Sequence, residues 1–464
     1  MASETQLTKK RHDVDMLHGG LFLKILAFSL PLAASSMLQQ LFNSVDVAVV
    51  GRFVGSNALA AVGSNGPVIS LLINLFLGVS MGANAVLSHH IGQNDQEGIR
   101  RTVSTVAVVA VVSGLFLAAA GWLAARPILE LIGTPEEILE MAVLYLRIYF
   151  LGIPFFMVFN FGAAILRSLG DTRRPLYILV AAGIVNTALN LFFVLVLDMG
   201  VEGVAIATSI ANAVSAAFIV RILLREAEPF RLHTRGLHVD RRQLARILKI
   251  GVPAGLQGVI FSLSNVIIQS TINSYGADAI AGSAAALNFE VYAYFIIQAF
   301  NGAAISFIAQ NYGAGRMDRV WRIFKICMVL GVCGCALLNA LFIWQDEFFL
   351  NFFSTSPAVH EYARIRMHYV LALQAMACSY EVTGSCMRGM GRSLTPTVLV
   401  VFGTCLLRIV WVFVVSPSWR GFDHLLVVYP LSWLLTGTMV VVAFVRFARR
   451  EERRLSKQGA EGHP

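Results

Sequence analysis

Twelve long apolar stretches constrain this chain more than any other feature of its sequence. Of its 464 residues, 57% are hydrophobic and only 14% are charged, whereas ordinary soluble domains carry about 25% charged residues. A helix needs about 20 consecutive apolar residues to cross a bilayer, and a span in lipid must satisfy its own backbone hydrogen bonds. The sequence therefore predicts an all-α integral membrane protein.

We expect twelve transmembrane helices, six in each half of the chain. Their predicted ranges are 24–50, 60–87, 101–124, 139–166, 175–197, 201–223, 245–274, 279–309, 323–345, 360–386, 394–416 and 424–447. These ranges divide the chain into a tail at 1–23, a first six-helix bundle at 24–223, a linker at 224–244, a second bundle at 245–447 and a basic tail at 448–464.

The basic residues are distributed unevenly between the two sides of this arrangement. With the start of the chain inside, 29 Lys and Arg lie on the inner side, and three, Arg52, Arg126 and Arg420, lie on the outer side. Because positive charge favours the cytoplasmic side, we expect both termini in the cytoplasm and the protein in the inner (plasma) membrane. This topology accounts for the net charge of +9, so we expect no nucleic-acid partner.

The second half of the sequence repeats the first. Matching residues lie 221 or 222 positions apart: Arg167–Gly170 with Arg388–Gly391, Pro175 with Pro396, Pro31 with Pro253 and Asn43 with Asn265. Because each half holds an even number of spans, both halves insert in the same orientation. Parallel repeats of this kind are related by an axis along the membrane normal, and two such pseudo-symmetric bundles leave a central cleft between them.

The predicted first span carries a stripe of polar side chains. Ser36, Gln39, Asn43 and Asp46 are spaced by three, four and three residues, so they share one face of the helix. An ionised carboxylate at membrane depth costs at least about 2.5–3.5 kcal/mol on insertion scales, so such a group pairs, takes up a proton or lines a watery cavity. The alternative is that Asp46 lies close enough to the end of the span to be solvated there.

Five further polar or charged residues fall inside predicted spans. Asn186 and Asn190 are one turn apart and share a face of the fifth span, while Glu290, Glu381 and Arg408 lie in the eighth, tenth and eleventh spans. Intramembrane ionisable groups mark ion or substrate paths. We expect one glutamate to neutralise Arg408, which leaves the other free to take up a proton. The alternatives are hydrogen bonds that only pack the helices and a purely structural ion pair.

Motifs of soluble enzymes are missing from the sequence. It contains no GxxxxGK[ST] loop for nucleotide phosphates and no HExxH zinc motif, and its six cysteines match no zinc or redox spacing. We therefore expect no cofactor and no ATP hydrolysis within this chain. An ion gradient is left as the source of energy, and Asp46 is the candidate site for it in the first half.

Four motifs together resemble the multidrug and toxic compound extrusion (MATE) family. They are Pro31–Gly51, which carries the stripe described above, Leu166–Pro175 (LRSLGDTRRP), Met387–Pro396 (MRGMGRSLTP) and Gln310–Arg316 (QNYGAGR). The resemblance extends over all twelve spans in order. It implies a V-shaped pair of six-helix bundles that exports drugs or other toxic small molecules, often lipophilic cations, in exchange for H⁺ or Na⁺. We expect the transporter to be monomeric.

The same resemblance implies roles for residues of the first bundle. Asp46 matches the carboxylate that prokaryotic members use for coupling, and Gln39 and Asn43 match its neighbours in the cavity. Pro31 matches the position at which a bend of the first helix has been linked to protonation of that carboxylate. We group Asn186 and Asn190 with this site.

The sequence departs from the family pattern in two places. The family commonly has a second aspartate on the fifth helix, where Asn190 stands here. Members best known for sodium coupling carry a glutamate on the seventh helix, whereas Gly251–Tyr275 holds no acid, and Glu290 lies on a different helix. A single carboxylate makes a weaker sodium cage than two, so the sequence favours H⁺ over Na⁺.

One alternative coupling site and two other functions stay open from the sequence. One hypothesis places the coupling site in the second bundle, at Glu290, Glu381 and Arg408. A flippase for lipid-linked oligosaccharides, from the same broad superfamily, favours a cavity dominated by arginine, whereas the intramembrane charges here lean acidic. A membrane-embedded enzyme needs a nucleophile or metal constellation, and no such spacing occurs.

Overall fold

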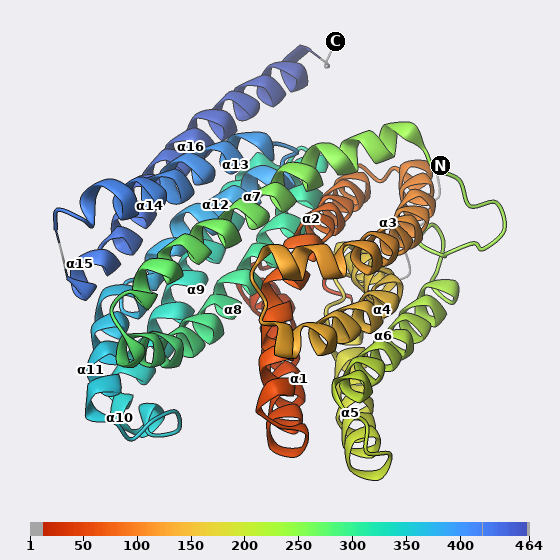
Figure 1. Ribbon diagram of the computed structural model, residues 1–464. Coiled ribbons are helices and arrows are strands. Elements are labelled where there is room, and N and C mark those ends of the chain that lie inside the picture. The colour runs from red at the N-terminus through yellow and green to blue at the C-terminus, as the bar shows by residue number, and fades with distance from the viewer. Residues whose placement is uncertain (1–12, 420, 462–464) are drawn as a thin grey trace. The chain divides into compact units, whose positions relative to one another are not determined.

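The computed structural model describes residues 13–419 and 421–461, and the regular structure within these ranges is helical (Figure 1). The first half contains α1 (Phe22–Val49), α2 (Ser56–Gly92), α3 (Gln96–Leu131), α4 (Glu136–Leu169), α5 (Arg173–Leu191) and α6 (Val201–Leu224), with π-helical turns η1 (Val50–Val54) and η2 (Phe192–Val196). The second half contains α7 (Arg241–Asn273), α8 (Ala277–Gly313), α9 (Met317–Trp344), α10 (Asp346–Leu350), α11 (Pro357–Arg366), α12 (Cys378–Gly389), α13 (Leu394–Val400), α14 (Leu407–Val410), α15 (Phe422–Leu426) and α16 (Val428–Glu461). The predicted all-α class is confirmed.

Eleven helical segments of the described residues are long and apolar enough to cross a membrane. They correspond to all the predicted spans except the tenth, at 360–386, which is helical but interrupted. There α11 passes into a π-helical turn, η3 (Met367–Leu371), and a 3-10 turn, η4 (Gln374–Ala377), before α12 begins. The Gln374 amide at the break donates to the backbone carbonyl of Glu290 in α8 at 2.8 Å. The interruption therefore lies beside a polar group of α8. π-helical turns are frequently found at functional sites.

The chain divides into two compact units, and the division falls within α1 and α7 rather than in the linker. Unit 1 comprises Met1–Gly19 and Leu30–Val252, and unit 2 comprises Gly20–Ser29 and Pro253–Pro464. The first turns of α1 thus belong to unit 2, and the first turns of α7 belong to unit 1. Each division lies next to a proline inside the helix, Pro31 or Pro253, whose missing N–H weakens the helical hydrogen bonding there.

One long helix lies at the centre of each unit. In unit 1, α4 packs against α2, α3 and α6, and in unit 2, α8 packs against α9, α11 and α12. Glycine permits the closest approaches, because a Cβ on Gly114 of α3 would lie 2.6 Å from the Cα of Pro154 in α4. Small residues at such crossings let helices pack tightly where lipid supplies no hydrophobic drive for association.

The motif shared by the two halves folds into the same kind of helix end. Gly170 ends α4 with a φ of 97°, and Gly391 follows α12 with a φ of 80°. Glycine adopts this left-handed conformation without steric cost. The prolines that follow, Pro175 and Pro396, lie in the first turn of α5 and α13, where the backbone N–H groups have no partner within the helix.

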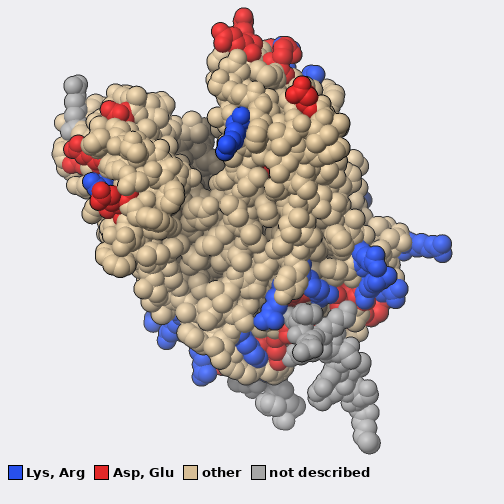
Figure 2. Space-filling model, turned by 90° about the horizontal axis from the view of Figure 1, so that it is seen from below, with Lys and Arg blue, Asp and Glu red and all other residues tan. Residues whose placement is uncertain are grey.

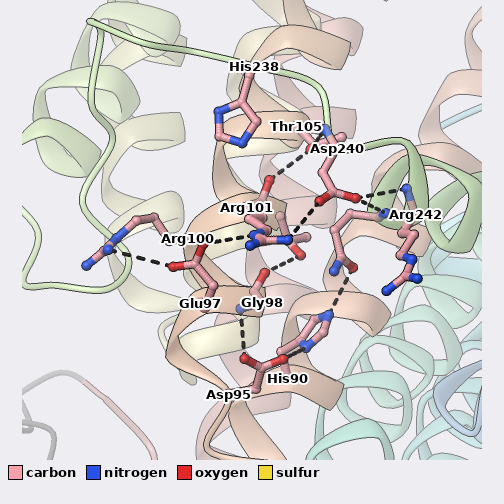
Figure 3. A network of polar contacts seen from close by, with 12 residues as sticks. His90, Asp95, Glu97, Gly98, Arg100, Arg101, Thr105, His238, Asp240 and Arg242 are labelled. Carbon is pink, nitrogen blue, oxygen red and sulfur yellow. Dashed lines mark hydrogen bonds and ion pairs between the residues drawn. The ribbon is translucent and has the colours of Figure 1, made fainter.

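The start of α7 is fixed to the end of α2 by a polar network (Figure 3). The buried His90 contacts Asp95 at 2.8 Å and Gln243 at 2.9 Å. Asp240 accepts a hydrogen bond from the Gln243 N–H at 3.0 Å. The backbone N–H groups of Gly98 and Gln243 are the largest causes that hold the pKa of Asp95 and of Asp240 below its ordinary value. Both carboxylates are therefore ionised caps at neutral pH.

A buried ion cluster joins α5 to the segment after α6. Asp171 accepts hydrogen bonds from the backbone N–H groups of Arg173 at 3.0 Å and Arg174 at 3.1 Å, and it pairs with the Arg174 guanidinium. The same guanidinium lies 2.6 Å from Glu226. A shift of 221 positions places Arg392 at the position of Asp171 in the second half, so the repeat does not conserve this cluster.

We predict that Asp171→Asn destabilises the protein by about 2 kcal/mol, because it removes the charge from the hydrogen bonds that Asp171 accepts, while Arg174 keeps its pair with Glu226. The measurement is the thermal unfolding of purified protein in detergent. Arg392→Gln changes the exposed residue at the matching position and should leave the unfolding temperature unchanged. Equal unfolding temperatures for Asp171→Asn and wild type would contradict a stabilising role for the cluster.

Candidate functional site

Asp46 lies where three helices of unit 1 meet. Its side chain, on α1, is only 7% exposed. The Asn186 amide of α5 donates to Oδ1 at 2.8 Å, the Asn190 amide donates to the same oxygen, and the Thr208 hydroxyl of α6 lies 3.4 Å from Oδ2. The structure therefore brings Asp46 together with the two predicted asparagines. It adds Thr208, whose only signal in the sequence is a hydroxyl inside an apolar span.

The local sequence explains why α5 reaches Asp46. Asn186 and Asn190 are one turn apart, so both amides project from the same face of α5. A Cβ at Gly183, on that face, would overlap the Phe42 ring of α1. The glycine thus permits the close approach of α5 to α1 that puts both amides within reach of one carboxylate.

The surroundings of the carboxylate are apolar on one side. The end of α1 after Asp46 packs into a buried hydrophobic cluster formed with α4, η2 and α6, whose members include Val49, Val50, Tyr145, Val194 and Val204. An ionised carboxylate in such surroundings is costly unless it is hydrogen-bonded. The amide and hydroxyl donors of α5 and α6 offset this cost.

All the hydrogen-bond partners of Asp46 in the described part of the chain are neutral. In addition, the side-chain oxygens of Asn186 and Asn190 are buried and have no hydrogen-bond partner. Rotation of an amide by half a turn exchanges its oxygen and nitrogen, so both oxygens can be turned toward Asp46. The site can therefore accept a proton on the carboxylate, or a small cation among the oxygens of Asp46, Asn186, Asn190 and Thr208.

The other predicted residues of the first helix do not share these contacts. Gln39 and Asn43 are exposed, and within residues 13–419 and 421–461 neither donates to Asp46. Pro31 lies inside the continuous α1, where its carbonyl accepts a hydrogen bond from the Ser35 hydroxyl at 2.7 Å. The predicted polar stripe thus consists of a buried carboxylate, the half-buried Ser36 and the exposed Gln39 and Asn43.

Glu290 is held by an arginine that the sequence analysis did not single out. Arg366, at the end of α11, donates to both Glu290 oxygens, at 2.6 Å and 3.0 Å, and both side chains are buried. A guanidinium and a carboxylate bind each other well in this two-pronged geometry. The expectation that Glu290 or Glu381 neutralises Arg408 is therefore wrong. The signal for the true partner was Arg366 itself, a charge inside the predicted tenth span.

Glu381 of α12 resembles Asp46 in having neutral hydrogen-bond donors. The Tyr294 hydroxyl and the Asn301 amide, both on α8, donate to it at 3.1 Å each. The buried Arg388, farther along α12, donates to Gln257 at 2.6 Å rather than to Glu381. Tyr294 and Asn301 were not predicted as site residues.

Arg408 of α14 is 1% exposed and has a different set of partners. It donates to Asn265 of α7 at 3.0 Å and lies 3.4 Å from the Ser432 hydroxyl. Its guanidinium lies 4.4 Å from the centroid of the Tyr429 ring, which Arg366 approaches at 5.6 Å. An aromatic face attracts a cation, so this ring stabilises two buried charges.

Matching positions of the two units carry different charges. The π-helical turn η5 (Val401–Leu406) adds one residue to the second half, so the shift changes from 221 to 222 and Arg408 falls at the position of Asn186. Asp46 correspondingly matches Ile268, which is fully buried. Unit 1 thus has its buried carboxylate on α1, whereas unit 2 has an apolar residue at that position and a buried guanidinium where α5 has Asn186.

The balance of buried charge in unit 2 also differs from the sequence expectation. Within the predicted spans, its buried acids include Glu290 and Glu381, and its buried bases include Arg366 and Arg408, so acids are not in excess. The prediction that intramembrane charges lean acidic is therefore wrong for unit 2.

Comparison with known proteins gives a consistent result. A family model described as MatE matches residues 31–192 and 253–414, one match in each half. The chain is 29% identical over 401 residues to a probable multidrug resistance protein, YoeA, of Bacillus subtilis strain 168, over 84% of this chain and 86% of the relative. It is 23% identical over 433 residues to the multidrug export protein MepA of Staphylococcus aureus strain NCTC 8325 / PS 47, over 89% of this chain and 95% of that protein.

Solved structures share the fold. A crystal structure of MATE in complex with MaL6 has a TM-score of 0.88 at 20% identity, over 96% of this chain and 100% of the solved chain. An outward-facing conformation of a multidrug resistance MATE family transporter has a TM-score of 0.86 at 20% identity, over 97% and 100% of the two chains.

The contacts predict unequal effects for the two glutamates of unit 2. Glu290→Gln leaves Arg366 buried without its carboxylate and should destabilise the protein by about 3–5 kcal/mol. Glu381→Gln keeps the shape of the side chain among its neutral donors but removes a charge that attracts the buried Arg388, and it should cost about 2 kcal/mol. Thermal unfolding of both variants in detergent tests the difference, and a larger loss for Glu381→Gln than for Glu290→Gln would refute the assignment.

Proposed function

The chain belongs to the MatE family, and from this premise we propose that it is a secondary antiporter that exports drugs or other toxic organic compounds in exchange for H⁺. The names of its relatives, multidrug resistance and multidrug export proteins, support the export function. Its long apolar helices support a multi-pass path through the membrane. Membership of this family also sets aside the membrane-embedded enzyme.

One observation carries the coupling role of Asp46. Its carboxylate is buried in a membrane-spanning helix and is hydrogen-bonded by neutral donors. When ionised, the group accepts these bonds. When protonated, it needs an acceptor, which the amide oxygen of Asn186 or Asn190 supplies after rotation. Uptake of a proton therefore alters the hydrogen bonds between α1 and α5.

Exchange follows if the proton and the exported compound exclude each other. A proton neutralises Asp46 and removes its attraction for a cationic compound, and a bound cation opposes protonation of Asp46. By thermodynamic linkage, the proton and the compound then lower each other's binding affinity by the same factor. We place Gln39 and Asn43 in the path by which compounds approach Asp46, since both are polar and exposed on the same helix. Bending of α1 at Pro31 is part of the proposal.

The choice of H⁺ over Na⁺ depends on the number of carboxylates. Asp46 is the one carboxylate among the side chains that meet at this site, because Asn190 stands where the family commonly has an aspartate. The oxygens of Asn186, Asn190 and Thr208 keep a sodium site chemically feasible, so Na⁺ is the alternative ion. A second coupling site at Glu381 is supported by its neutral donors.

The proposed topology has both termini in the cytoplasm and the protein in the inner membrane. Figure 2 shows Lys and Arg side chains along the lower edge of the view, with some Asp and Glu among them. A bias of Lys and Arg to one side is the pattern that orients membrane proteins. In this proposal 24–223 and 245–447 are the two lobes, 224–244 is the linker, and the protein acts as a monomer.

A flippase is the second candidate, and a specific observation favours it. The buried Arg408 of unit 2 has neutral hydrogen-bond partners among the described residues, and its charge suits an anionic headgroup better than a cationic drug. Proteoliposomes separate the two candidates, since a flippase moves a lipid-linked anion between leaflets and the antiporter moves a soluble compound against an ion gradient.

We predict that Asp46→Asn abolishes the gradient-driven export of cationic dyes from proteoliposomes, because an amide cannot exchange a proton for a cation. The measurement uses a pH gradient and a sodium gradient imposed separately. The pH gradient should drive wild-type export, and the sodium gradient should not.

Asp278→Asn is the matched control, because it removes an exposed carboxylate at the start of α8 and should export at the wild-type rate. Full-rate export by Asp46→Asn would remove Asp46 from the coupling role. Export driven by the sodium gradient alone would replace H⁺ by Na⁺.

A further inference from the structure

A basic pocket lies at one end of unit 2, and its lining includes none of the candidate coupling residues. It has a volume of about 400 Å³ and lies between α16 and the turn that joins α12 to α13. Three arginines and three apolar side chains line most of it: Arg392, Arg446, Arg450, Met387, Ala443 and Phe447. The pocket therefore combines positive charge with an apolar wall.

The three arginines have no ion-pair partner among the described residues. Arg392 lies 5.2 Å from the centroid of the Phe447 ring, which fixes its position without cancelling its charge. The nearest acid along α16 is Glu451, which lies 2.9 Å from the Tyr312 hydroxyl and 3.4 Å from Arg454. The pocket thus carries a positive charge that its own side chains leave unbalanced.

The repeat explains how this pocket arises. At a shift of 221, buried positions of α6 match buried positions of α16, such as Ile219 with Val440 and Leu223 with Phe444. This agreement supports the alignment of α6 with α16 at that shift. In unit 1 the matching place is filled by Asp171, Arg174 and Glu226, which pair with one another. Their counterparts in unit 2 are Arg392, Thr395 and Phe447. Loss of both acids and of the arginine that fills the space leaves an open basic pocket.

From this chemistry we propose that the pocket binds the headgroup of an anionic phospholipid. Arginine binds phosphate oxygens through two parallel hydrogen bonds, and basic pockets between membrane helices on the cytoplasmic side hold acidic headgroups. Phe447 and Met387 supply an apolar surface for the adjoining acyl chains. The fully buried Phe444 lies one turn deeper in α16, so the charged end of the pocket adjoins the apolar part of the helix, as an amphiphile requires. The leaflet follows from the proposed topology and is the cytoplasmic one.

The test measures lipid adducts on the purified full-length protein by native mass spectrometry. Phosphatidylglycerol is the probe, and phosphatidylcholine with the same chains is the neutral comparison. Replacing Arg392, Arg446 and Arg450 together by Gln should weaken phosphatidylglycerol binding by about a hundredfold, since each arginine near anionic lipid is worth about fivefold. Phosphatidylcholine binding should not change.

Two further variants keep the test decisive. The control variant replaces three arginines of unit 1 and the linker by Gln: Arg225, Arg231 and Arg235. It removes the same charge and should retain wild-type lipid binding. Phe447→Glu restores the acid that unit 1 has at this position and should abolish phosphatidylglycerol binding by pairing with the arginines.

If the pocket and control variants lost phosphatidylglycerol binding equally, the loss would follow from net charge alone, and the proposal would be overturned. Retention of phosphatidylglycerol by both the triple pocket variant and Phe447→Glu would also overturn it. Displacement of the lipid by inorganic phosphate at low concentration would assign the pocket to a free anion instead.

Discussion

The hydrogen bonds between the Asp46 carboxylate and the amides of α5 are the interaction on which the proposed mechanism depends. A single acid within an apolar helix is stable only because neutral donors from two neighbouring helices satisfy it. Those donors cannot cancel its charge, so the group stays able to bind a proton or a cation. The stability of the site and its reactivity therefore have the same cause.

The two halves show how one scaffold supports different chemistry. Both use a left-handed glycine and a following proline to turn from one span to the next. On the matching pairs of helices, however, unit 1 has Asp46 of α1 with the amides of α5, and unit 2 has Arg408 of α14 with Asn265 of α7. The same divergence operates at the helix ends, where Asp171 is replaced by Arg392. A single-residue insertion at η5 and a few charge changes are enough to make the units chemically unequal.

Helical periodicity and composition predicted much of the fold. Eleven spans could be located because each is a long apolar run, and Asn186 and Asn190 could be assigned to one face because they are one turn apart. The pairing of Glu290 with Arg366 could not be predicted, because the two residues are 76 positions apart and no local pattern relates them. The break at Met367–Ala377 was equally hidden, since that segment contains neither Pro nor Gly. The coupling role of Asp46 stays a prediction.

Proton release on substrate binding tests the role of Asp46 most directly. Purified protein in weakly buffered detergent solution is mixed with a lipophilic cation, and a pH indicator reports the protons released. If Asp46 couples transport, wild type releases a proton as the cation binds, and Asp46→Asn binds the cation with no release. Equal proton release from the two proteins would contradict this role.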